Sequence, residues 1–354
     1  MEPPIRREKS MKHFCSRFLY VAAGVAAIAG PSISSPATAQ SETPYAGRTV
    51  TVIIPGAPSG AGNDLWGRLV ARHIGKHLPG RPMVVPQNIP GAGGLNAANY
   101  IYNIAPKDGT ALGIVPSSLP LGPLVGLAGA RFDALKFGWI GSLTMITDVC
   151  IAMARAPVKT FQDLLAKELI TGDTGVGSGP YFYPKALNGI LGTKFKLISG
   201  FPSTSNIHLA MERNEIDAVC HPLDAVVSSR PDWIASKTVN VLFQGGARPN
   251  PQLKGVPMIV DLARTPEEKQ AVAFLYAGSG LGRPFVAPPD VPAERVKMLR
   301  DAFMAAMTDP DFLADAERQK LDIQPENGEH LAALIKKIYA TPRPIVDRVT
   351  ELIK

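Results

Sequence analysis

The stretch Thr49-Val50-Thr51-Val52-Ile53-Ile54 runs directly into Pro55-Gly56-Ala57-Pro58-Ser59-Gly60-Ala61-Gly62-Asn63-Asp64. The β-branched run predicts a strand, and the apolar periodicity of residues 65–77 predicts a helix. Glycines between them let backbone N–H groups approach a ligand, and the helix adds its positive N-terminus. The stretch therefore predicts a strand, an anion-binding loop and a helix, with a small carboxylate or phosphate as the ligand.

Short apolar runs alternate with helical patterns along the rest of the chain, which is typical of βαβ units and mostly parallel sheets. Further strands are expected at 83–88, 111–115, 149–154, 169–171, 195–198, 218–220, 239–244 and 284–287. Further helices are expected at 95–104, 161–167, 181–191, 206–213, 267–276, 291–307, 331–339 and 345–353. The pattern predicts an α/β fold and disfavours a helical bundle.

The order of these elements divides the chain into two lobes. Residues 48–143 together with 281–354 are expected to form lobe 1, and residues 144–280 are expected to form lobe 2. This division requires two crossovers, which together make a hinge. Small ligands usually bind in the cleft between such lobes.

The first 39 residues have the pattern of a secretion signal. A basic leader precedes an apolar run at 18–29, and Ala37-Thr38-Ala39 provides small residues for cleavage. We expect removal of residues 1–39 near Ala39 and a periplasmic location, with Met1 or Met11 as the start. A retained N-terminal anchor is the alternative.

Charge and cysteines narrow the choice of partners. The net charge is +7 over 354 residues, without a basic stripe interleaved with aromatics, so we expect no nucleic-acid partner. Cys15 lies in the leader, whereas Cys150 and Cys220 each lie in an expected strand. An oxidising compartment allows a disulfide between these two, and two separate buried thiols are the alternative.

Three further glycine- or serine-rich loops precede helices. Strand-end loops of this kind converge on one edge of a sheet, so 174–180 and 200–205 are expected to face the first loop; surface turns with hydroxyl caps are the alternative. For the loop 90–94 we favour a packing role. Neither this loop nor the first one has the GxGxxG spacing of dinucleotide sites.

Asp64 is expected to be the N-cap of the helix that follows the first loop. Arg68 stands four residues later, so it can pair with the Asp64 carboxylate along the helix. A ligand should then lie over residues 57–62 rather than over Asp64.

Catalytic and metal sites lack support in the sequence. His73 and His77 have helical i, i+4 spacing without the glutamate of HExxH, which favours a solvated helix face. Ser178 is outside a GxSxG motif, and no pattern places His221 beside Asp224 in a triad. We expect no catalytic residue, no metal and no cofactor.

Several motifs in order along the mature chain resemble the solute-binding receptors of tripartite tricarboxylate transporters, the TctC or Bug family. They are Pro55-Gly56 with Gly60, Asp64 and Arg68; Asn88 with Pro90-Gly91-Ala92-Gly93-Gly94; Asp108-Gly109-Thr110-Ala111-Leu112; Phe285-Val286-Ala287-Pro288 with Val291-Pro292; and Asp309-Pro310-Asp311-Phe312. The resemblance implies the two-lobed, type II periplasmic-binding-protein fold and a non-enzymatic receptor.

Carried over by position, the resemblance also implies a set of ligand-binding residues. These are Ala57, Pro58, Ser59, Gly60, Ala61 and Asn63 in lobe 1, with Ser117 and Ser118 as a weaker addition, and Val176, Gly177, Ser178, Gly179, Ser203, Thr204 and Ser205 in lobe 2. The chain departs from the family pattern at Gln87, at Pro58-Ser59 and at Phe201-Pro202-Ser203. The last departure alters the loop that helps to shape the pocket.

The expected function is capture of a small carboxylate-bearing organic anion by a monomer, followed by delivery to membrane transporter subunits. One alternative is a ligand sensor for a membrane histidine kinase. The other is a secreted α/β hydrolase or transferase, which would need a convergent acid, base and nucleophile.

Overall fold

The structure, a computed structural model, describes residues 43–353. The predicted signal peptide at 1–39 lies outside these described residues. Within residues 43–353, every helix is too short or too polar to cross a membrane.

One sheet is built from both the early and the late parts of the chain. Its strands are β1 (Thr49–Pro55), β2 (Met83–Ile89), β3 (Ala111–Ile114), β4 (Gly138–Ser142), β10 (Pro284–Ala287) and β11 (Glu326–Asn327). Their order across the sheet is β11-β4-β10-β3-β1-β2. β1 is parallel to β2 and β3, whereas β10 is antiparallel to β3 and β4, and β11 to β4.

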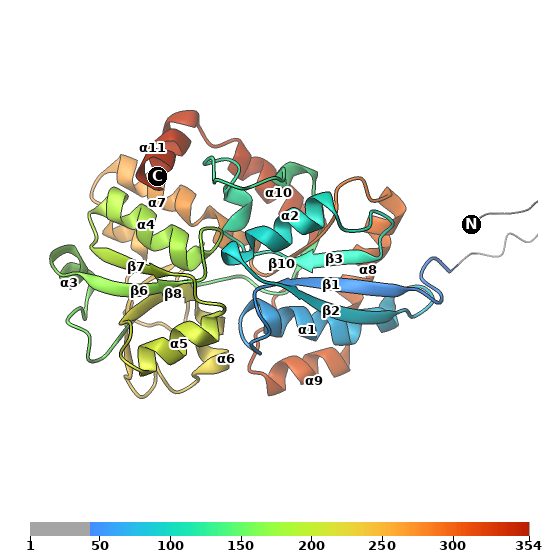
Figure 1. Ribbon diagram of the computed structural model, residues 1–354, viewed down its shortest axis with the longest axis horizontal. Coiled ribbons are helices and arrows are strands. Elements are labelled where there is room, and N and C mark those ends of the chain that lie inside the picture. The colour runs from blue at the N-terminus through green and yellow to red at the C-terminus, as the bar shows by residue number, and fades with distance from the viewer. Residues whose placement is uncertain (1–42, 354) are drawn as a thin grey trace, which may run out of the picture. The chain divides into compact units, whose positions relative to one another are not determined.

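The second sheet uses only the middle of the chain. Its strands are β5 (Asp148–Met153), β6 (Leu169–Asp173), β7 (Phe195–Ser199), β8 (Ala218–Pro222) and β9 (Val239–Gly245), in the order β7-β6-β8-β5-β9. β6 is parallel to β7 and β8, and β5 is antiparallel to β8 and β9. Figure 1 shows the strands of this sheet in green and yellow, beside β1, β2, β3 and β10 of the first.

The predicted fold class of two α/β lobes is confirmed, but the sheets are mixed rather than mostly parallel. Parallel pairs arise where a helix connects two strands, because such a crossover returns the chain in the same direction. The antiparallel pairs all involve β4, β5, β9, β10 or β11, the strands next to the passages between the sheets or late in the chain. β5 and β10 are the strands with which the chain enters each sheet from the other, and each is antiparallel to both of its neighbours.

Helices cover the sheets on both faces. They are α1 (Asn63–His73), α2 (Leu95–Asn103), α3 (Phe161–Ala166), α4 (Gly179–Leu191), α5 (Thr204–Glu212), α6 (Leu223–Ser229), α7 (Pro266–Leu275), α8 (Ala293–Met307), α9 (Pro310–Arg318), α10 (Gly328–Tyr339) and α11 (Arg343–Ile353). Short 3₁₀ turns are η1 (Ile74–His77), η2 (Ala92–Gly94), η3 (Leu119–Leu121), η4 (Ala134–Lys136), η5 (Ile259–Leu262) and η6 (Ala277–Leu281).

The alternation of β1 explains how the first sheet is buried. Val52 and Ile54 pack with Trp66 of α1, whereas Ile53 faces the other side and packs with Leu95 of α2. All five side chains are less than 5% exposed. Helices on both faces of the strand therefore fix the strand-to-helix loops at one edge of the sheet.

The second sheet is buried in the same way and carries a disulfide. Cys150 of β5 and Cys220 of β8 are register partners on adjacent strands, and their sulfurs are bonded. Both face the core that contains α4, whereas Val149 and Val219 face α5 and α6 on the opposite side. The disulfide is one of the two alternatives that the sequence leaves open.

The last helix lies apart from the lobe to which the sequence assigned it. The division by sequence placed residues up to 354 in lobe 1, but α11 packs against α4 and α7 of the second lobe (Figure 1). Its buried Val346 and Val349 join the apolar core around α4. An amphipathic helix is stable only where its apolar face finds a partner, and here α4 and α7 provide it.

The two passages between the sheets lie side by side. β4 leads into β5 while the return chain enters β10, and Ser142 of β4 is the register partner of Pro284. The backbone N–H of Arg283 donates to Ser142 Oγ at 2.8 Å. Gly282 has a φ of +67°, and a Cβ there would lie 1.7 Å from the Thr144 carbonyl oxygen, so this close approach requires glycine.

Candidate functional site

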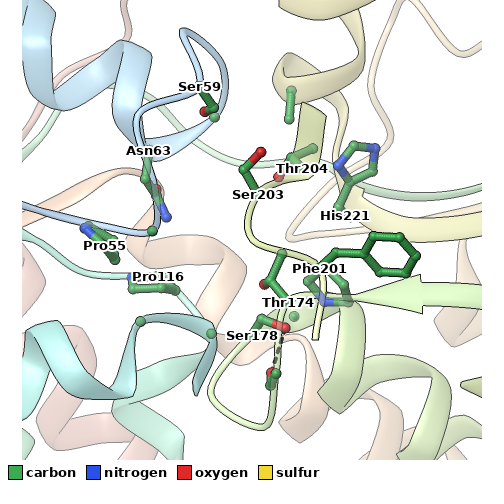
Figure 2. A pocket seen from close by; sticks show the side chains of 18 of the residues that line it. Pro55, Ser59, Asn63, Pro116, Thr174, Ser178, Phe201, Ser203, Thr204 and His221 are labelled. Carbon is green, nitrogen blue, oxygen red and sulfur yellow. Dashed lines mark hydrogen bonds between the residues drawn. The ribbon is translucent and has the colours of Figure 1, made fainter. Parts of the chain in front are cut away.

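A cavity of about 370 Å³ lies between the lobes. Loops that follow β1, β2 and β3 line one side, and loops that follow β6, β7 and β8 line the other. Figure 2 shows Pro55, Ser59, Asn63 and Pro116 facing Thr174, Ser178, Ser203 and Thr204 across this space. Carboxyl ends of strands are the usual place for ligands in open α/β sheets, and the volume suits a small molecule.

Asp64 shapes the loop after β1, but it is not the N-cap of α1. The N-cap is Gly62, and Asp64 is the second helical residue. Its carboxylate turns back and accepts the N–H groups of Ser59 and Gly60, both at 2.8 Å. The predicted pair with Arg68 is confirmed at 2.9 Å.

Asp64 therefore accepts hydrogen bonds from two loop amides that were expected to bind a ligand. Its side chain is 3% exposed and also accepts from Asn88 Nδ2 at 3.0 Å. Burial alone would raise the pKa of Asp64, but the N–H donors of Gly60 and Ser59, the Asn88 amide and Arg68 outweigh it and hold the pKa below 3.8. The carboxylate thus remains charged and keeps the loop in one conformation.

Asp64→Asn is expected to lower the free energy of unfolding by about 1–2 kcal/mol at pH 7, because charge-assisted bonds become neutral ones. Since the folded pKa lies below the unfolded one, this stabilisation is present above pH 3.8 and is lost as the pH falls through the folded value. Urea denaturation at pH 7 and pH 3 measures it. Asp232→Asn, at an exposed position, is the control; an equal loss in both variants would contradict the assignment.

Two serines predicted to bind ligand are helix N-caps. Ser178 Oγ accepts the N–H of Tyr181 at 3.3 Å and donates to the carbonyl of Gly175 at 2.8 Å. Ser203 Oγ accepts the N–H of Asn206 at 3.4 Å and donates to its Oδ1 at 2.7 Å. Both hydroxyls line the cavity but are already engaged, so they position α4 and α5.

Other polar groups in the wall have no protein partner within residues 43–353. They are the hydroxyls of Ser117, Ser118, Thr174 and Thr204 and the Nδ2 of Asn63. Each can donate a hydrogen bond into the cavity. The groups free to contact a ligand are therefore four hydroxyls and one amide that are separate from the capping serines.

Three helices begin at the cavity. The first residues of α1 come from one lobe, and those of α4 and α5 come from the other. The N–H groups of a first helical turn have no partner within their helix, and the helix dipole makes that end positive. Because the three ends converge, the cavity favours an anion.

An ion pair that the sequence did not predict, between a buried arginine of the cavity wall and a partly buried aspartate, joins the two lobes beside the site. Arg283, 4% exposed, donates from Nε and Nη2 to the Asp224 carboxylate and from Nη1 to Asn63 Oδ1 at 2.9 Å. Trp66 Nε1 donates to the same carboxylate at 2.5 Å. Asp224 of α6 thus neutralises Arg283 and joins α1 of the first lobe to α6 of the second.

A second missed acid, Asp148, also lines the cavity. It is 2% exposed and accepts the Ser279 hydroxyl at 2.7 Å. Burial raises its pKa to about 6, against the lowering influence of Ser279, Tyr183 and Arg283. The Tyr183 ring stacks on Tyr276 with centroids 4.3 Å apart, which encloses the acid.

His221 of β8 also lines this wall of the cavity. The sequence gives no support for His221 as a member of a catalytic triad and does not predict it as a site residue. It is 1% exposed and its Nε2 lies 3.4 Å from Nε2 of His208. Burial lowers its pKa well below 6.5, so the ring is neutral. In the sequence, the only local indication that His221 belongs to the site is its position immediately before Pro222, at the end of an expected strand.

The structure brings together most of the sequence-predicted residues. Those lining the cavity are Ala57, Ser59, Ala61, Asn63, Ser117, Ser118, Ser178, Gly179, Ser203 and Thr204. Those outside its lining are Pro58, Gly60, Val176, Gly177 and Ser205. Pro58 and Gly60 are exposed, whereas Gly177 donates its N–H to the carbonyl of Ala92 at 3.0 Å and Ser205 reaches the Ser59 carbonyl at 3.5 Å.

The glycine loop Pro90–Gly94 both packs and lines the cavity. The expected packing between helix and strand is present at Gly94, the N-cap of α2, where a Cβ would lie 3.1 Å from Cβ of Pro55 in β1. A second close approach, at Gly93, is to the loop of the other lobe. A Cβ on Gly93 would lie 2.4 Å from the Ser178 backbone nitrogen and 2.6 Å from the Gly175 carbonyl. The loop therefore meets the N-terminus of α4 directly.

Within residues 43–353 no group of three or more His, Cys, Asp or Glu side chains is placed to hold a metal ion. His73 and His77, expected on a solvated helix face, instead lie 3.0 Å from Asp315 and Asp309. These carboxylates belong to α9 and its N-cap, so the two histidines pair with acids.

No protein-family model matches the chain, and a search of curated proteins found no match. Solved structures do resemble it. The periplasmic binding protein BugD has a TM-score of 0.66 at 20% identity, covering 87% of this chain and 97% of that one. Rpa4515 of R. palustris with adipate has a TM-score of 0.65 at 18% identity, covering 86% and 97%.

MatC from Rhodopseudomonas palustris, with bound malate, has a TM-score of 0.64 at 18% identity, covering 86% of this chain and 99% of that one. The resemblance therefore extends over nearly all of each of these structures. Together with the two sheets and the cavity between them, it shows that the chain has the fold of the Bug- and TctC-type periplasmic binding proteins.

Proposed function

We propose that the protein is a divergent TctC/Bug-type solute receptor that captures a small carboxylate-bearing organic anion between its lobes. The observation that carries this proposal is the convergence of three helix N-termini and unpartnered hydroxyls on one cavity. Preorganised N–H and O–H donors stabilise a carboxylate without a bound metal or a basic side chain.

An anion in this cavity would be bound by dipoles rather than by a free cationic side chain. Arg283 is neutralised by Asp224, so no free guanidinium of the described chain is aimed into the cavity. Structural neighbours have been solved with adipate and with malate, both carboxylates. The non-enzymatic reading follows from the same geometry, since Ser178 caps a helix rather than facing a base.

Delivery to a membrane partner rests on the contacts from both lobes. A ligand favours one arrangement of the lobes only by binding it more tightly than another, and donors from α1, α4 and α5 meet that requirement. We infer a Venus-flytrap closure in the periplasm, after removal of the signal peptide near Ala39, and recognition of the closed form by subunits of a tripartite tricarboxylate-type transporter.

A thermal-shift screen of the purified protein tests the proposal. Mono- and dicarboxylates, aromatic acids, amino acids and neutral sugars are compared, with titration calorimetry on each hit. A carboxylate is expected to raise the melting temperature in proportion to ln(1 + [L]/Kd). Stabilisation by neutral compounds alone would refute carboxylate binding.

Thr204→Val should weaken carboxylate binding about tenfold and leave the melting temperature of the free protein unchanged, because the hydroxyl has no partner in the described chain. Calorimetry and thermal unfolding measure the two effects. Ser178→Ala provides the contrast, since loss of its cap is expected to cost about 1 kcal/mol of stability. Full affinity in Thr204→Val would remove that hydroxyl from the site.

A further inference from the structure

His221 presents one ring nitrogen to the cavity without a partner. The side chain is 1% exposed and lines the cavity on the second-lobe side, opposite Asn63 and Ser59 (Figure 2). Its Nδ1 is buried and has no hydrogen-bond partner among residues 43–353. Whether Nδ1 donates or accepts depends on where the proton of this ring lies, and the neighbouring groups determine that.

The hydroxyl of Ser229 on α6 determines where the two neighbouring histidine rings carry their protons. This hydroxyl donates to the carbonyl of Ala225 at 2.7 Å, and the same oxygen lies 2.7 Å from Nδ1 of His208. A carbonyl can only accept, so the single hydroxyl proton points to Ala225. His208 must therefore donate from Nδ1 to Ser229 Oγ.

The next hydrogen bond is between the rings of His208 and His221. Burial, with Arg230 nearby, lowers the pKa of His208 to about 4, so at pH 7 the ring is neutral and carries one proton. That proton is on Nδ1, which leaves Nε2 of His208 as an acceptor. His221, 3.4 Å away, must then donate from its own Nε2.

This series of hydrogen bonds leaves Nδ1 of His221 as a lone-pair acceptor buried in the cavity wall. We propose that the ligand carries, besides its carboxylate, a hydrogen-bond donor that binds His221 Nδ1: a hydroxyl or a protonated amine. The inference rests on the proposed function and narrows its ligand class from carboxylates to hydroxy or amino acids. A buried acceptor without a partner is costly, so a ligand that supplies the donor gains the bond and removes the penalty.

Asp148 reinforces the acceptor character of this part of the wall. Asp148 and His221 lie on the paired strands β5 and β8, where Asp148 faces Pro222 and Val149 faces His221 in register. Both side chains line the cavity and both are buried. The ends of β5 and β8 thus offer acceptors, whereas the starts of α1, α4 and α5 offer donors, which is complementary to a ligand with a carboxylate and a donor.

Matched acids test the inference by calorimetry at pH 7. The first series is succinate, malate and aspartate, which carry no additional donor, a hydroxyl and an ammonium group, respectively. Propionate, lactate and alanine form the corresponding shorter series. At least one donor-bearing acid is expected to bind about tenfold or more tightly than its unsubstituted partner. Equal or tighter binding of the unsubstituted acids would overturn the inference.

The second test replaces the imidazole of His221 by a ring that has no hydrogen-bond acceptor. His221→Phe is expected to reduce the preference for the donor-bearing acid to less than about twofold while the unsubstituted acid keeps its affinity. His330→Phe, at an exposed position of α10, is the matched control and should keep the full preference. A preference that persists in His221→Phe would overturn the role of this ring.

A measurement without ligand separates the inference from the proposed function. Long-range ¹H–¹⁵N correlation NMR reports which ring nitrogens are protonated, and we expect Nε2–H on His221 and Nδ1–H on His208. A proton on Nδ1 of His221 would overturn the inference even if carboxylates bind. If the tautomers are as expected but no acid binds while amines or sugars do, carboxylate capture fails and the acceptor assignment stands.

Discussion

Asp224→Ala is expected to lower the free energy of unfolding by about 3–5 kcal/mol, the usual cost of leaving a buried charge, here Arg283, without its partner. Arg283 is 4% exposed, and within residues 43–353 Asp224 is the one acid that forms a direct ion pair with it. The Trp66 indole N–H, also buried, loses the same acceptor. One truncation therefore leaves a guanidinium and an N–H group unsatisfied in the same place.

Chemical denaturation at pH 7 measures this loss, and Asp232→Ala on the exposed surface of the same lobe is the control. The double variant Asp224→Leu with Arg283→Met removes both charges and is expected to recover much of the stability, because no charge remains buried. A loss below about 1 kcal/mol in Asp224→Ala would mean that water solvates Arg283, as it does exposed pairs.

The loops of the candidate site could be predicted because their signals are local. β-Branched runs such as Thr49–Ile54 identify strands, and a glycine-rich segment before a helical pattern identifies the loop that follows. In an α/β sheet such loops meet at one edge, which brings 174–180 and 200–205 together, whereas their position opposite the loop after β1 depends on how the two lobes pack.

Three elements, β4, α6 and α9, escaped prediction for identifiable reasons. β4 contains Gly138 and Gly141, which are poor strand formers; Gly141 is required because a Cβ there would lie 2.7 Å from the Phe303 ring. α6 begins after Pro222 and reads Leu-Asp-Ala-Val-Val, a pattern closer to a strand than a helix. α9 is missing from the expected helices because it begins at a proline, but proline is favoured in the first turn of a helix, here after the N-cap Asp309.

The polar interior of the site could not be predicted from local sequence. Arg283, Asp224 and Trp66 are far apart in the chain, and their partnership depends on how the lobes pack. Asp148 and His221 are single polar residues at strand ends, where surface positions and buried positions look alike in sequence. Which hydroxyls are free also follows only from three-dimensional contacts, since Ser178 and Ser203 are caps while Thr204 is not.

Gly93→Ala is expected to weaken carboxylate binding about 100-fold or more, close to 3 kcal/mol. A Cβ at this position would lie 2.4 Å from the Ser178 nitrogen and 2.6 Å from the Gly175 carbonyl, both backbone atoms that cannot move aside cheaply. The clash arises only when the two lobes are in contact, so it penalises the arrangement that holds the ligand from both sides.

The control for this substitution is Gly126→Ala, because the two glycines share a left-handed backbone but differ in their surroundings. Gly93 has a φ of +65° and Gly126 a φ of +67°, and a Cβ on Gly126 meets no atom within 4 Å. Both variants should lose a similar, small amount of stability from backbone strain, and only Gly93→Ala should lose affinity by calorimetry. If Gly93→Ala binds a carboxylate as tightly as Gly126→Ala does, the loops at Gly93 and Ser178 do not meet in the ligand-bound protein, and the two-sided capture proposed above is wrong.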